Sequence, residues 1–441
     1  MKLKLVALTM SILGLISTPA LAAHSKKHHR KHHRHHHVVR HQEVASSQDY
    51  KAMGALPVMV SPAAMIYQHM SQNMSRSMPT PEWFNRVGIA GGINVDMLKW
   101  GSRSANFQGE NYRHISINDA YINLTGNVND WAKAFASITY GNPTGTATSG
   151  IRSTVLTVPT GDAGAPGSSY SHVYANDVLS LEQAYITLAN FDSSPFFFQV
   201  GKQFQDFSRY EIHPITRSMT QVLSEALQTS AKLGFVTPAG FNGSVYAFDD
   251  MKKAINYGLS LGFEQLNDQM GYDLGVGYVY SMTAANDVAF AVGSINGSGV
   301  GTSGTYAHRV GGLALYGDVN SGPFSLGARY TTALQRFSAS DLPTNFTGTT
   351  GAKPWAAGIQ AGYGYEGMGR NQNVYLGYQT SRQAGLVGIP RSRWSAGLNV
   401  DAWKYTNVGV QWDHDNDYST SNGGYSRTTN LLSARLAVKF G

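Results

Sequence analysis

The sequence contains no cysteine among its 441 residues. Disulfide bonds, thiol nucleophiles and cysteine metal sites are therefore excluded. Beyond the N-terminal region it also lacks an uninterrupted apolar run of about 18 residues, the length that a transmembrane helix requires. Charge is scarce as well, since 14% of the residues are charged, against about 25% in typical globular proteins. These absences disfavour both a helical membrane protein and an ordinary soluble domain.

Glycine and tyrosine are abundant instead, with 48 and 24 residues. Glycine alone exceeds its usual share of about 7%. A transmembrane β-barrel has this composition, because its lipid face is apolar only on alternate residues and its interior is polar. The composition therefore predicts an all-β membrane barrel.

The first residues have the pattern of an export signal. Lys2 and Lys4 precede an apolar run that extends from Leu5 to Ile16, and an A-x-A site follows at Ala20-Leu21-Ala22. A basic start, a short apolar stretch and a small-residue cleavage site are the marks of a secretory signal peptide. We expect residues 1–22 to be removed on export.

Residues 23–50 form a basic tail that carries nine of the fifteen histidines. Such a segment cannot bury a core, so we expect disorder. Loose capture of Zn, Cu, Ni or Fe is one interpretation, because neutral imidazole is a good metal ligand. The other interpretation is a solvated basic tail that rests on anionic envelope polymers. Beyond such metal ions, we expect no cofactor. The weak metal-ligand candidates are His28, His29, His32, His33, His35, His36 and His37.

The net charge of +7 belongs to this N-terminal region. Eight of the 34 cations lie in the leader and the tail, and the remaining 26 are matched by 27 acidic residues. A basic average of this kind does not predict nucleic-acid binding.

Residues 51–85 contain six methionines. They predict a short helix or a plug that packs in a groove or at the barrel mouth, and a soft-metal site is the alternative.

The remaining chain, residues 86–441, alternates between apolar and polar residues in short segments separated by turn formers, which is the signal of β-strands. Tight turns such as Asn127-Val128-Asn129 and Asn320-Ser321-Gly322 alternate with long polar loops, as an outer-membrane barrel requires. An even number of strands places both termini in the periplasm. We expect outer-membrane lipid around the barrel, and the sequence does not specify the oligomeric state. We predict sixteen strands, over residues 86–98, 114–126, 130–140, 178–190, 196–205, 229–237, 241–249, 254–265, 271–284, 306–319, 323–335, 354–366, 371–381, 391–403, 405–417 and 429–440.

One predicted strand breaks the alternation. In residues 196–205 the face that carries Phe196, Phe198 and Val200 also carries Lys202. A lysine on lipid is expensive at mid-depth. The sequence therefore predicts either a β-bulge that shifts the register or a lysine that reaches toward a polar boundary.

Several short motifs resemble one family of outer-membrane proteins. They are Asn118-Asp119-Ala120-Tyr121, Gly201-Lys202-Gln203-Phe204, Ile212-His213-Pro214-Ile215-Thr216 and Leu223-Ser224-Glu225. With the final strand, they are similar to the LbtU-type siderophore porins, barrels that work without TonB. The resemblance implies passive uptake of a ferric siderophore. Members often carry an N-terminal coiled coil, which the histidine and methionine tracts replace here.

Strand parity also predicts which polar side chains face the interior. Inward cations would attract carboxylate or phosphate solutes, although a wide barrel has inward charges in any case. The pore-lining candidates are Lys133, Arg329, Arg393, Asn399, Gln411, Asp413 and Arg435.

The third long loop, residues 206–228, is a candidate for a constriction. In porins this loop often folds inward, and the alternative is an exposed surface loop. The constriction-loop candidates are Arg209, Glu211, His213, Arg217 and Glu225.

The sequence as a whole predicts a porin-like channel for a small solute. A general diffusion porin and an adhesin or structural barrel with functional outer loops are the alternatives. An enzyme is not expected, because Asp413-His414-Asp415 is the only candidate constellation and no nucleophile accompanies it. Sixteen strands favour a channel, since a barrel that wide encloses water unless it is plugged.

Overall fold

The computed structural model describes residues 87–100, 112–141, 154–155, 171–172, 178–209, 215–249, 254–266, 270–295, 306–345 and 348–440. The expected signal peptide, the histidine tail with its metal-ligand candidates and the methionine-rich segment lie outside these residues. Among the described residues, no helix combines the length and the apolar composition needed to cross a membrane.

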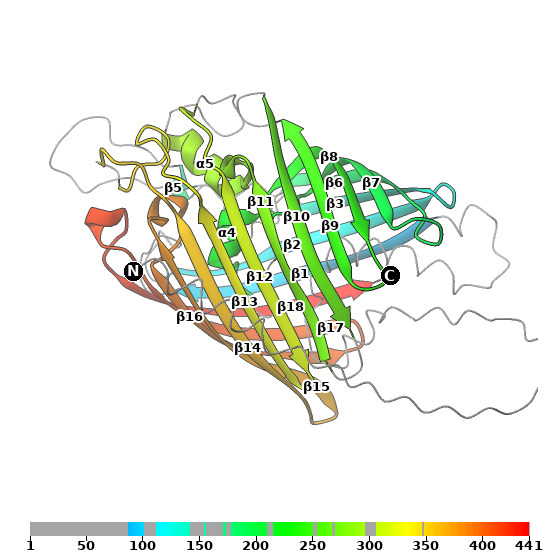
Figure 1. Ribbon diagram of the computed structural model, residues 1–441. Helices are drawn as coiled ribbons and strands as arrows, with labels where there is room; N and C mark the ends of the chain where they lie inside the picture. The colour runs from blue at the N-terminus through cyan, green and yellow to red at the C-terminus, as the bar shows by residue number, and fades with distance from the viewer. Residues whose placement is uncertain are drawn as a thin grey trace, which may run out of the picture. The chain divides into compact units, whose positions relative to one another are not determined.

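Sixteen antiparallel strands close into one barrel, and β1 completes it by pairing with both β2 and β18 (Figure 1). The predicted fold class and strand number are therefore confirmed. The barrel strands are β1 (Val87–Trp100), β2 (Tyr112–Asn127), β3 (Ala132–Gly141), β6 (Val178–Ala189), β7 (Phe196–Phe204), β8 (Leu227–Val236), β9 (Phe241–Asp249), β10 (Ile255–Leu266), β11 (Met270–Val279), β12 (Gly312–Ser321), β13 (Phe324–Ala333), β14 (Trp355–Gly367), β15 (Arg370–Arg382), β16 (Ser392–Trp403), β17 (Thr406–Asn416) and β18 (Thr428–Phe440). A separate two-stranded sheet, β4 (Thr154–Val155) and β5 (Ser171–His172), lies in the connection between β3 and β6.

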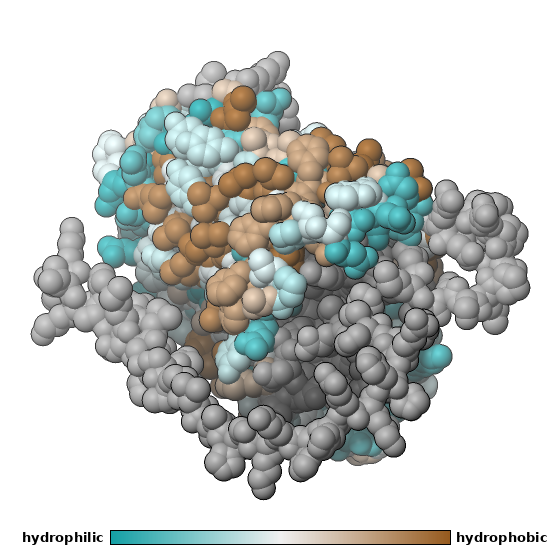
Figure 2. Space-filling model, turned by 45° about the vertical axis from the view of Figure 1, so that its right-hand side comes forward, coloured by the Kyte–Doolittle hydropathy of each residue, from teal (hydrophilic) through white to brown (hydrophobic). Residues whose placement is uncertain are grey.

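Alternation along each strand separates an apolar outer face from a polar inner face. In β18 the side chains of Leu432, Leu436 and Phe440 are exposed, whereas Leu431 and Ser433 are buried. Hydrophobic residues accordingly spread over the visible barrel surface (Figure 2). An exposed apolar band of this kind is stable against lipid and unstable against water.

Short connections lie at one end of the barrel and mostly longer ones at the other, where only β9 and β10 are joined by as few as five residues. The turns between β2 and β3, β12 and β13, β14 and β15, and β16 and β17 are only a few residues long. Gly322 and Gly369 take positive φ angles in two of them, a conformation that glycine adopts without a steric cost. The opposite end carries the long connections, and we call the two ends the short-turn end and the long-loop end.

Two predicted strands are too long. Met282, Thr283 and Ala284 form a 3-10 helix, η2 (Met282–Ala284), rather than the end of β11, and β12 begins only at Gly312. The apolar residues in these stretches, such as Tyr306 and Val310, are buried among loops and not in the barrel wall. Tertiary packing of the loops therefore produced a strand-like pattern outside the strands.

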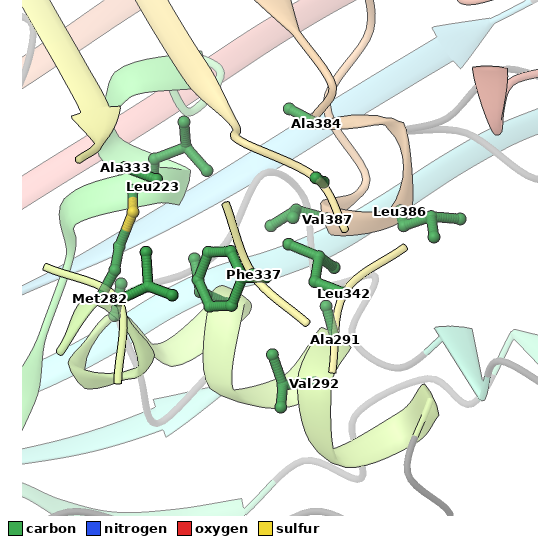
Figure 3. Packing of buried hydrophobic residues seen from close by; sticks show 14 of the residues in the cluster. Leu223, Met282, Ala291, Val292, Ala333, Phe337, Leu342, Ala384, Leu386 and Val387 are labelled. Atoms are coloured by element: carbon green, nitrogen blue, oxygen red, sulfur yellow. The ribbon is translucent and has the colours of Figure 1, made fainter. Parts of the chain in front are cut away.

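The long-loop end is packed around an apolar core, which we call the outer-loop cluster. It draws on the connections β7–β8, β11–β12, β13–β14 and β15–β16, and includes α4 (Met219–Ser224), α5 (Asn286–Ile295) and η3 (Gly385–Val387). Leu223, Met282, Phe337 and Leu342 are among the side chains that meet there (Figure 3). All four are at most 3% exposed, so these loops form a packed structure at the mouth.

Lys202 is accommodated by irregular backbone around it. Its ammonium group donates to the carbonyl of Leu181 at 2.8 Å, and the register between β3 and β6 shifts next to Glu182. Gly201 has a φ angle of +136°, and a Cβ there would lie 2.2 Å from the carbonyl oxygen of Ala184. A bulge is thus present on the neighbouring strand, and the lysine hydrogen-bonds to a backbone carbonyl.

Candidate functional site

The connection between β7 and β8, residues 205–226, leaves and re-enters the barrel at two neighbouring strands. Phe204 and Leu227 are paired, so a short turn could join them. The connection instead contacts side chains of β15, β16, β17 and β18, which lie across the barrel from β7 and β8 in the strand order. Its described residues, 205–209 and 215–226, thus contact opposite parts of the inner wall, and we call this connection the crossing loop.

The helix in the crossing loop is set by its first residue. Ser218 has extended backbone, and its hydroxyl accepts a hydrogen bond from the Gln221 amide at 3.0 Å. Serine is a preferred N-cap because its oxygen satisfies one of the unpaired amide groups of the first turn. Met219 and Leu223 of this helix are buried in the outer-loop cluster. The cap therefore starts the helix where its apolar face can pack.

Asp413, on the inner face of β17, is the centre of the contact between wall and loop. Its carboxylate accepts hydrogen bonds from the hydroxyl of Thr216 at 2.9 Å and from the hydroxyl of Ser395 at 2.5 Å. The amide of Gln411 also donates to it, at 2.8 Å. Asp413 is fully buried, so these donors replace the water that a carboxylate would otherwise bind.

Gln411 adds a second link, because its side-chain oxygen accepts from the backbone amide of Ile215 and from the hydroxyl of Tyr375. Gly409, two residues earlier on β17, leaves the space that the Ile215 side chain occupies: a Cβ at Gly409 would lie 3.1 Å from Ile215 Cδ1. One wall residue thus bonds the loop backbone while the next inward position accommodates its side chain.

Arg393 fixes the following residues of the loop. Its Nε and Nη2 donate to Asp415 Oδ1 and Oδ2 at 2.7 and 2.9 Å, and its Nη1 donates to the carbonyl of Arg217 at 3.1 Å. Both partners of the ion pair are 1% exposed. A bidentate pair holds the guanidinium plane in one orientation, which leaves a donor aimed at the loop.

Two further contacts extend the anchor to β18 and β15. Arg435 makes a bidentate pair with Asp96 of β1, 2.7 Å at each oxygen, and also donates to the carbonyl of Ile215 at 3.2 Å. The amide of Met219 donates to the side-chain oxygen of Gln379 at 2.7 Å. The backbone from Ile215 to Met219 is therefore held by side chains from four successive strands.

Ion pairs also connect the crossing loop with the outer-loop cluster. Arg217 lies 3.2 Å from Glu225 Oε1 and 2.8 Å from Asp287 Oδ2 of α5. Arg217 and Glu225 are nearly inaccessible. This pairing connects the crossing loop with the loop between β11 and β12.

The wall from which the loop departs carries its own paired charges. Lys232 is 3.0 Å from Asp206, whose other oxygen accepts from Ser244 at 2.7 Å. Arg209 lies 3.5 Å from Asp273, and its guanidinium stacks over the ring of Tyr316, 5.2 Å from the centroid. The start of the crossing loop is thus bound to its own side of the barrel as well.

The structure brings together five of the seven pore-lining candidates. Arg393, Asn399, Gln411 and Asp413 are buried on the inner face of β16 and β17, with Arg435 beside them on β18. Arg329 lies on β13 in a bidentate pair with Asp318, and Lys133 lies on β3 opposite Asn127, partly exposed. Of the loop candidates, Arg209, Arg217 and Glu225 form the ion pairs above, and Glu211 and His213 lie outside the described residues.

Six inward cations of the described residues are paired with carboxylates. Arg209, Arg217, Lys232, Arg329, Arg393 and Arg435 each have a carboxylate within 3.5 Å. The partners Asp96, Asp318 and Asp415 lie on neighbouring strands, whereas Asp206, Glu225 and Asp287 lie outside the strands. A paired cation exerts a weaker field on a solute than an isolated one, and the attraction of carboxylate or phosphate solutes by these cations stays a prediction.

The Asp-His-Asp sequence in β17 does not form a catalytic arrangement. His414 is stacked on Trp412 and its Nδ1 lies 2.9 Å from the side-chain oxygen of Asn430, on the outer face. Asp413 and Asp415 are buried on the inner face, because successive residues of a strand point to opposite sides. Among the described residues, no group of three or more histidine or acidic side chains is placed to hold a metal ion.

Comparison with known proteins finds relatives of low identity. No family model matches the chain. A UPF0422 protein of Coxiella burnetii is 24% identical over 389 residues, which are 86% of this chain and 74% of the relative. A UPF0422 protein of Legionella pneumophila is 25% identical over 294 residues, 60% of this chain and 54% of the relative. The chain therefore spans about half the length of that Legionella relative. The names of these relatives do not mention a transported solute.

Solved structures of outer-membrane channels are similar in fold. OprB of Pseudomonas putida matches with a TM-score of 0.50 and 11% identity, over 80% of this chain and 94% of the other. The outer-membrane channel DcaP of Acinetobacter baumannii matches with a TM-score of 0.49 and 12% identity, over 80% of this chain and 97% of the other. At this identity the likeness concerns the fold alone. The protein has the fold of an outer-membrane porin, a closed antiparallel barrel of sixteen strands.

Proposed function

We propose that the protein is a porin-like channel of the outer membrane through which a small solute diffuses passively. The observation that carries the proposal is the crossing loop, which leaves β7 on one side and has its residues 215–219 anchored to β15–β18 on the other. A barrel of sixteen strands is wide enough for an aqueous channel. A loop held across it narrows that channel without filling it with an independent domain.

The orientation follows from the two unlike ends of the barrel. Porins carry short turns on the periplasmic side and longer loops outside. We therefore place the short-turn end, with both termini, in the periplasm, and the outer-loop cluster at the cell surface. A solute would pass the packed outer loops before it reaches the crossing loop.

The ferric siderophore remains a candidate solute on the strength of the motif resemblance alone. The motif Ile212-His213-Pro214-Ile215-Thr216 includes two residues of the anchor, Ile215 and Thr216. The part of the motif that the structure describes therefore belongs to the anchor of the crossing loop on β17. This supports a role of the motif in the channel, whichever solute passes.

The test is the single-channel conductance of the refolded mature chain in a planar bilayer, with full-length and histidine-tail-deleted forms compared. Discrete conductance steps support the channel, and block by one ferric chelate but not by its iron-free form would add the siderophore. Well-folded protein that gives no conductance in either form would overturn the proposal and favour an adhesin or structural barrel.

A further inference from the structure

Four exposed cations gather at the long-loop end of β13–β16, which are successive neighbours in the barrel (Figure 1). Arg336 follows β13, Lys353 precedes β14, Arg382 ends β15 and Arg391 precedes β16. The carbonyl of Arg391 accepts a hydrogen bond at 2.9 Å from the amide of Ser381, the neighbour of Arg382. We call these four cations the basic surface.

The side chain of Gln383 connects the other members of this surface. Its oxygen accepts from the backbone amide of Lys353 at 2.7 Å and from Nη1 of Arg336 at 3.4 Å. Arg382 directly precedes Gln383 in the chain. The same Nη1 donates to the carbonyl of Gly351 at 3.1 Å. The cations therefore belong to one surface that spans two connections, and not to separate loops.

Acidic side chains do not neutralise this surface. The two connections, residues 334–354 and 383–391, contain one acidic residue, Asp341. Asp341 is 1% exposed, and its two oxygens accept from the amide of Ala307 at 2.9 and 2.8 Å. Among the residues that the structure describes, none of the four cations forms an ion pair. The basic surface thus differs from the six paired cations inside the barrel.

A row of aromatic side chains lies on the outer face beside the basic surface. Tyr330, Trp355, Tyr378 and Trp394 lie on the four strands in turn and alternate with buried inner-face neighbours, so they point outward. Their ring centroids are 6.1 Å apart in the first pair and 4.6 Å apart in the second. Such aromatic rows mark the boundary between hydrocarbon and headgroups. Trp355 is the strand partner of Arg382, so the basic surface begins at this boundary.

We propose that the basic surface binds the phosphorylated headgroups of lipid in the leaflet at the cell surface. Guanidinium and ammonium groups bind phosphate oxygens through charge-assisted hydrogen bonds, and clustered cations beside a membrane attract anionic lipid. The acyl chains of the bound lipid lie along the apolar outer wall below the aromatic row. The inference goes beyond the proposed channel and rests on its proposed orientation, with the long-loop end at the cell surface.

The experiment titrates lipid A, an acylated glucosamine disaccharide with two phosphate groups, into the refolded protein in neutral detergent. Native mass spectrometry measures the fraction of protein that carries lipid. The wild type should bind lipid A. Replacement of one cation, Arg382→Gln, should weaken binding about fivefold, the contribution of one cation beside an anionic surface. The fourfold variant Arg336→Gln/Lys353→Gln/Arg382→Gln/Arg391→Gln should weaken it at least about tenfold.

The matched control Arg370→Gln/Lys404→Gln removes two exposed cations at the short-turn end and should keep wild-type binding. Circular dichroism establishes that each variant is folded. Equal binding by the wild type and the fourfold variant, or equal binding of lipid A and its dephosphorylated form, would refute the basic surface as a lipid site. Loss of binding in the control instead of the fourfold variant would refute the orientation as well.

A further arm adds millimolar inorganic phosphate to the wild type with bound lipid A. We expect the lipid to stay bound, and its displacement would show a site for free phosphate instead. The channel is tested separately by conductance. A protein that conducts without binding lipid A would refute the lipid site while the channel stands, whereas a protein that binds lipid A without conducting would refute the channel alone.

Discussion

Arg393 and Asp415 face each other across β16 and β17 in a bidentate ion pair, and the same guanidinium donates a third hydrogen bond to the carbonyl of Arg217 in the crossing loop. The pair thus joins the barrel wall and the crossing loop. Both side chains are 1% exposed. Replacing one of them therefore leaves a buried charge that destabilises the fold, whereas replacing both removes the charges together with the hydrogen bond to the loop.

The first prediction concerns this pair. Arg393→Met should lower the free energy of unfolding by about 3–5 kcal/mol, because it leaves the Asp415 carboxylate buried without its cation. The double variant Arg393→Met/Asp415→Leu should recover most of that loss, since no uncompensated charge remains. Urea titrations of the protein folded into lipid vesicles measure both. Equal losses in the single and double variants would show that the charge is not the cause.

The second prediction concerns the hydrogen bond between Thr216 and Asp413. A double-mutant cycle of Thr216→Val and Asp413→Asn should give a coupling free energy of about 0.5–3 kcal/mol, as expected for side chains in direct contact. Thr216→Val combined with Asp318→Asn is the control, because Asp318 lies on β12, far round the wall from β17. That pair should be additive within about 0.5 kcal/mol. Additivity in both cycles would contradict the described loop path.

The third prediction tests which face meets lipid. Leu376 lies at the centre of β15 and is 55% exposed. Leu376→Arg should lower the free energy of unfolding by about 2–4 kcal/mol, the range for a cation at the bilayer midplane. Met368→Arg, in the turn between β14 and β15, should cost at most about 1 kcal/mol. Urea titrations in lipid vesicles measure the free energy of unfolding of both variants. A Leu376→Arg variant as stable as the wild type would contradict the assignment of this face to lipid.

The fourth prediction concerns alkaline pH at the long-loop end. Burial raises the pKa of Tyr418 from 10.0 to about 12, although its hydrogen bond with Ser381 acts in the opposite direction. The folded state therefore favours the neutral phenol. The stability from this group is complete below pH 10.0 and is lost as the pH rises through about 12. The difference between tyrosinate absorption titrations of wild type and Tyr418→Phe should show one phenol ionising near pH 12; ionisation near pH 10 would show that Tyr418 is not buried.

Much of the barrel could be predicted from the sequence because a strand's periodicity is local. In β18 the alternation of Leu432, Leu436 and Phe440 with Ser433 is visible in the residues themselves. Parity also placed Arg393 and Asp413 on one face. The pairing of Arg393 with Asp415 could not be predicted from the hairpin turn at Lys404 and Tyr405, because the register shifts between Asp401 and Trp403, and an unshifted register would pair Arg393 with Asn416.

The site depended on contacts that no local pattern encodes. Ile215 and Gln411 are 196 positions apart in the sequence, and nothing in either segment specifies the other. Tyr306 and Val310 were wrongly assigned to a strand because burial among loops gives the same apolar spacing as burial in a wall.

The most direct test of the account replaces the crossing loop by a short turn between Phe204 and Leu227 and compares single-channel conductance with the wild type. These residues are paired, so the barrel can close without the loop. A matched variant that shortens the connection between β17 and β18 serves as the control. We expect a marked rise in conductance for the first variant and little change for the second. Equal conductance in all three proteins, each shown to be folded, would contradict the claim that the crossing loop forms the constriction.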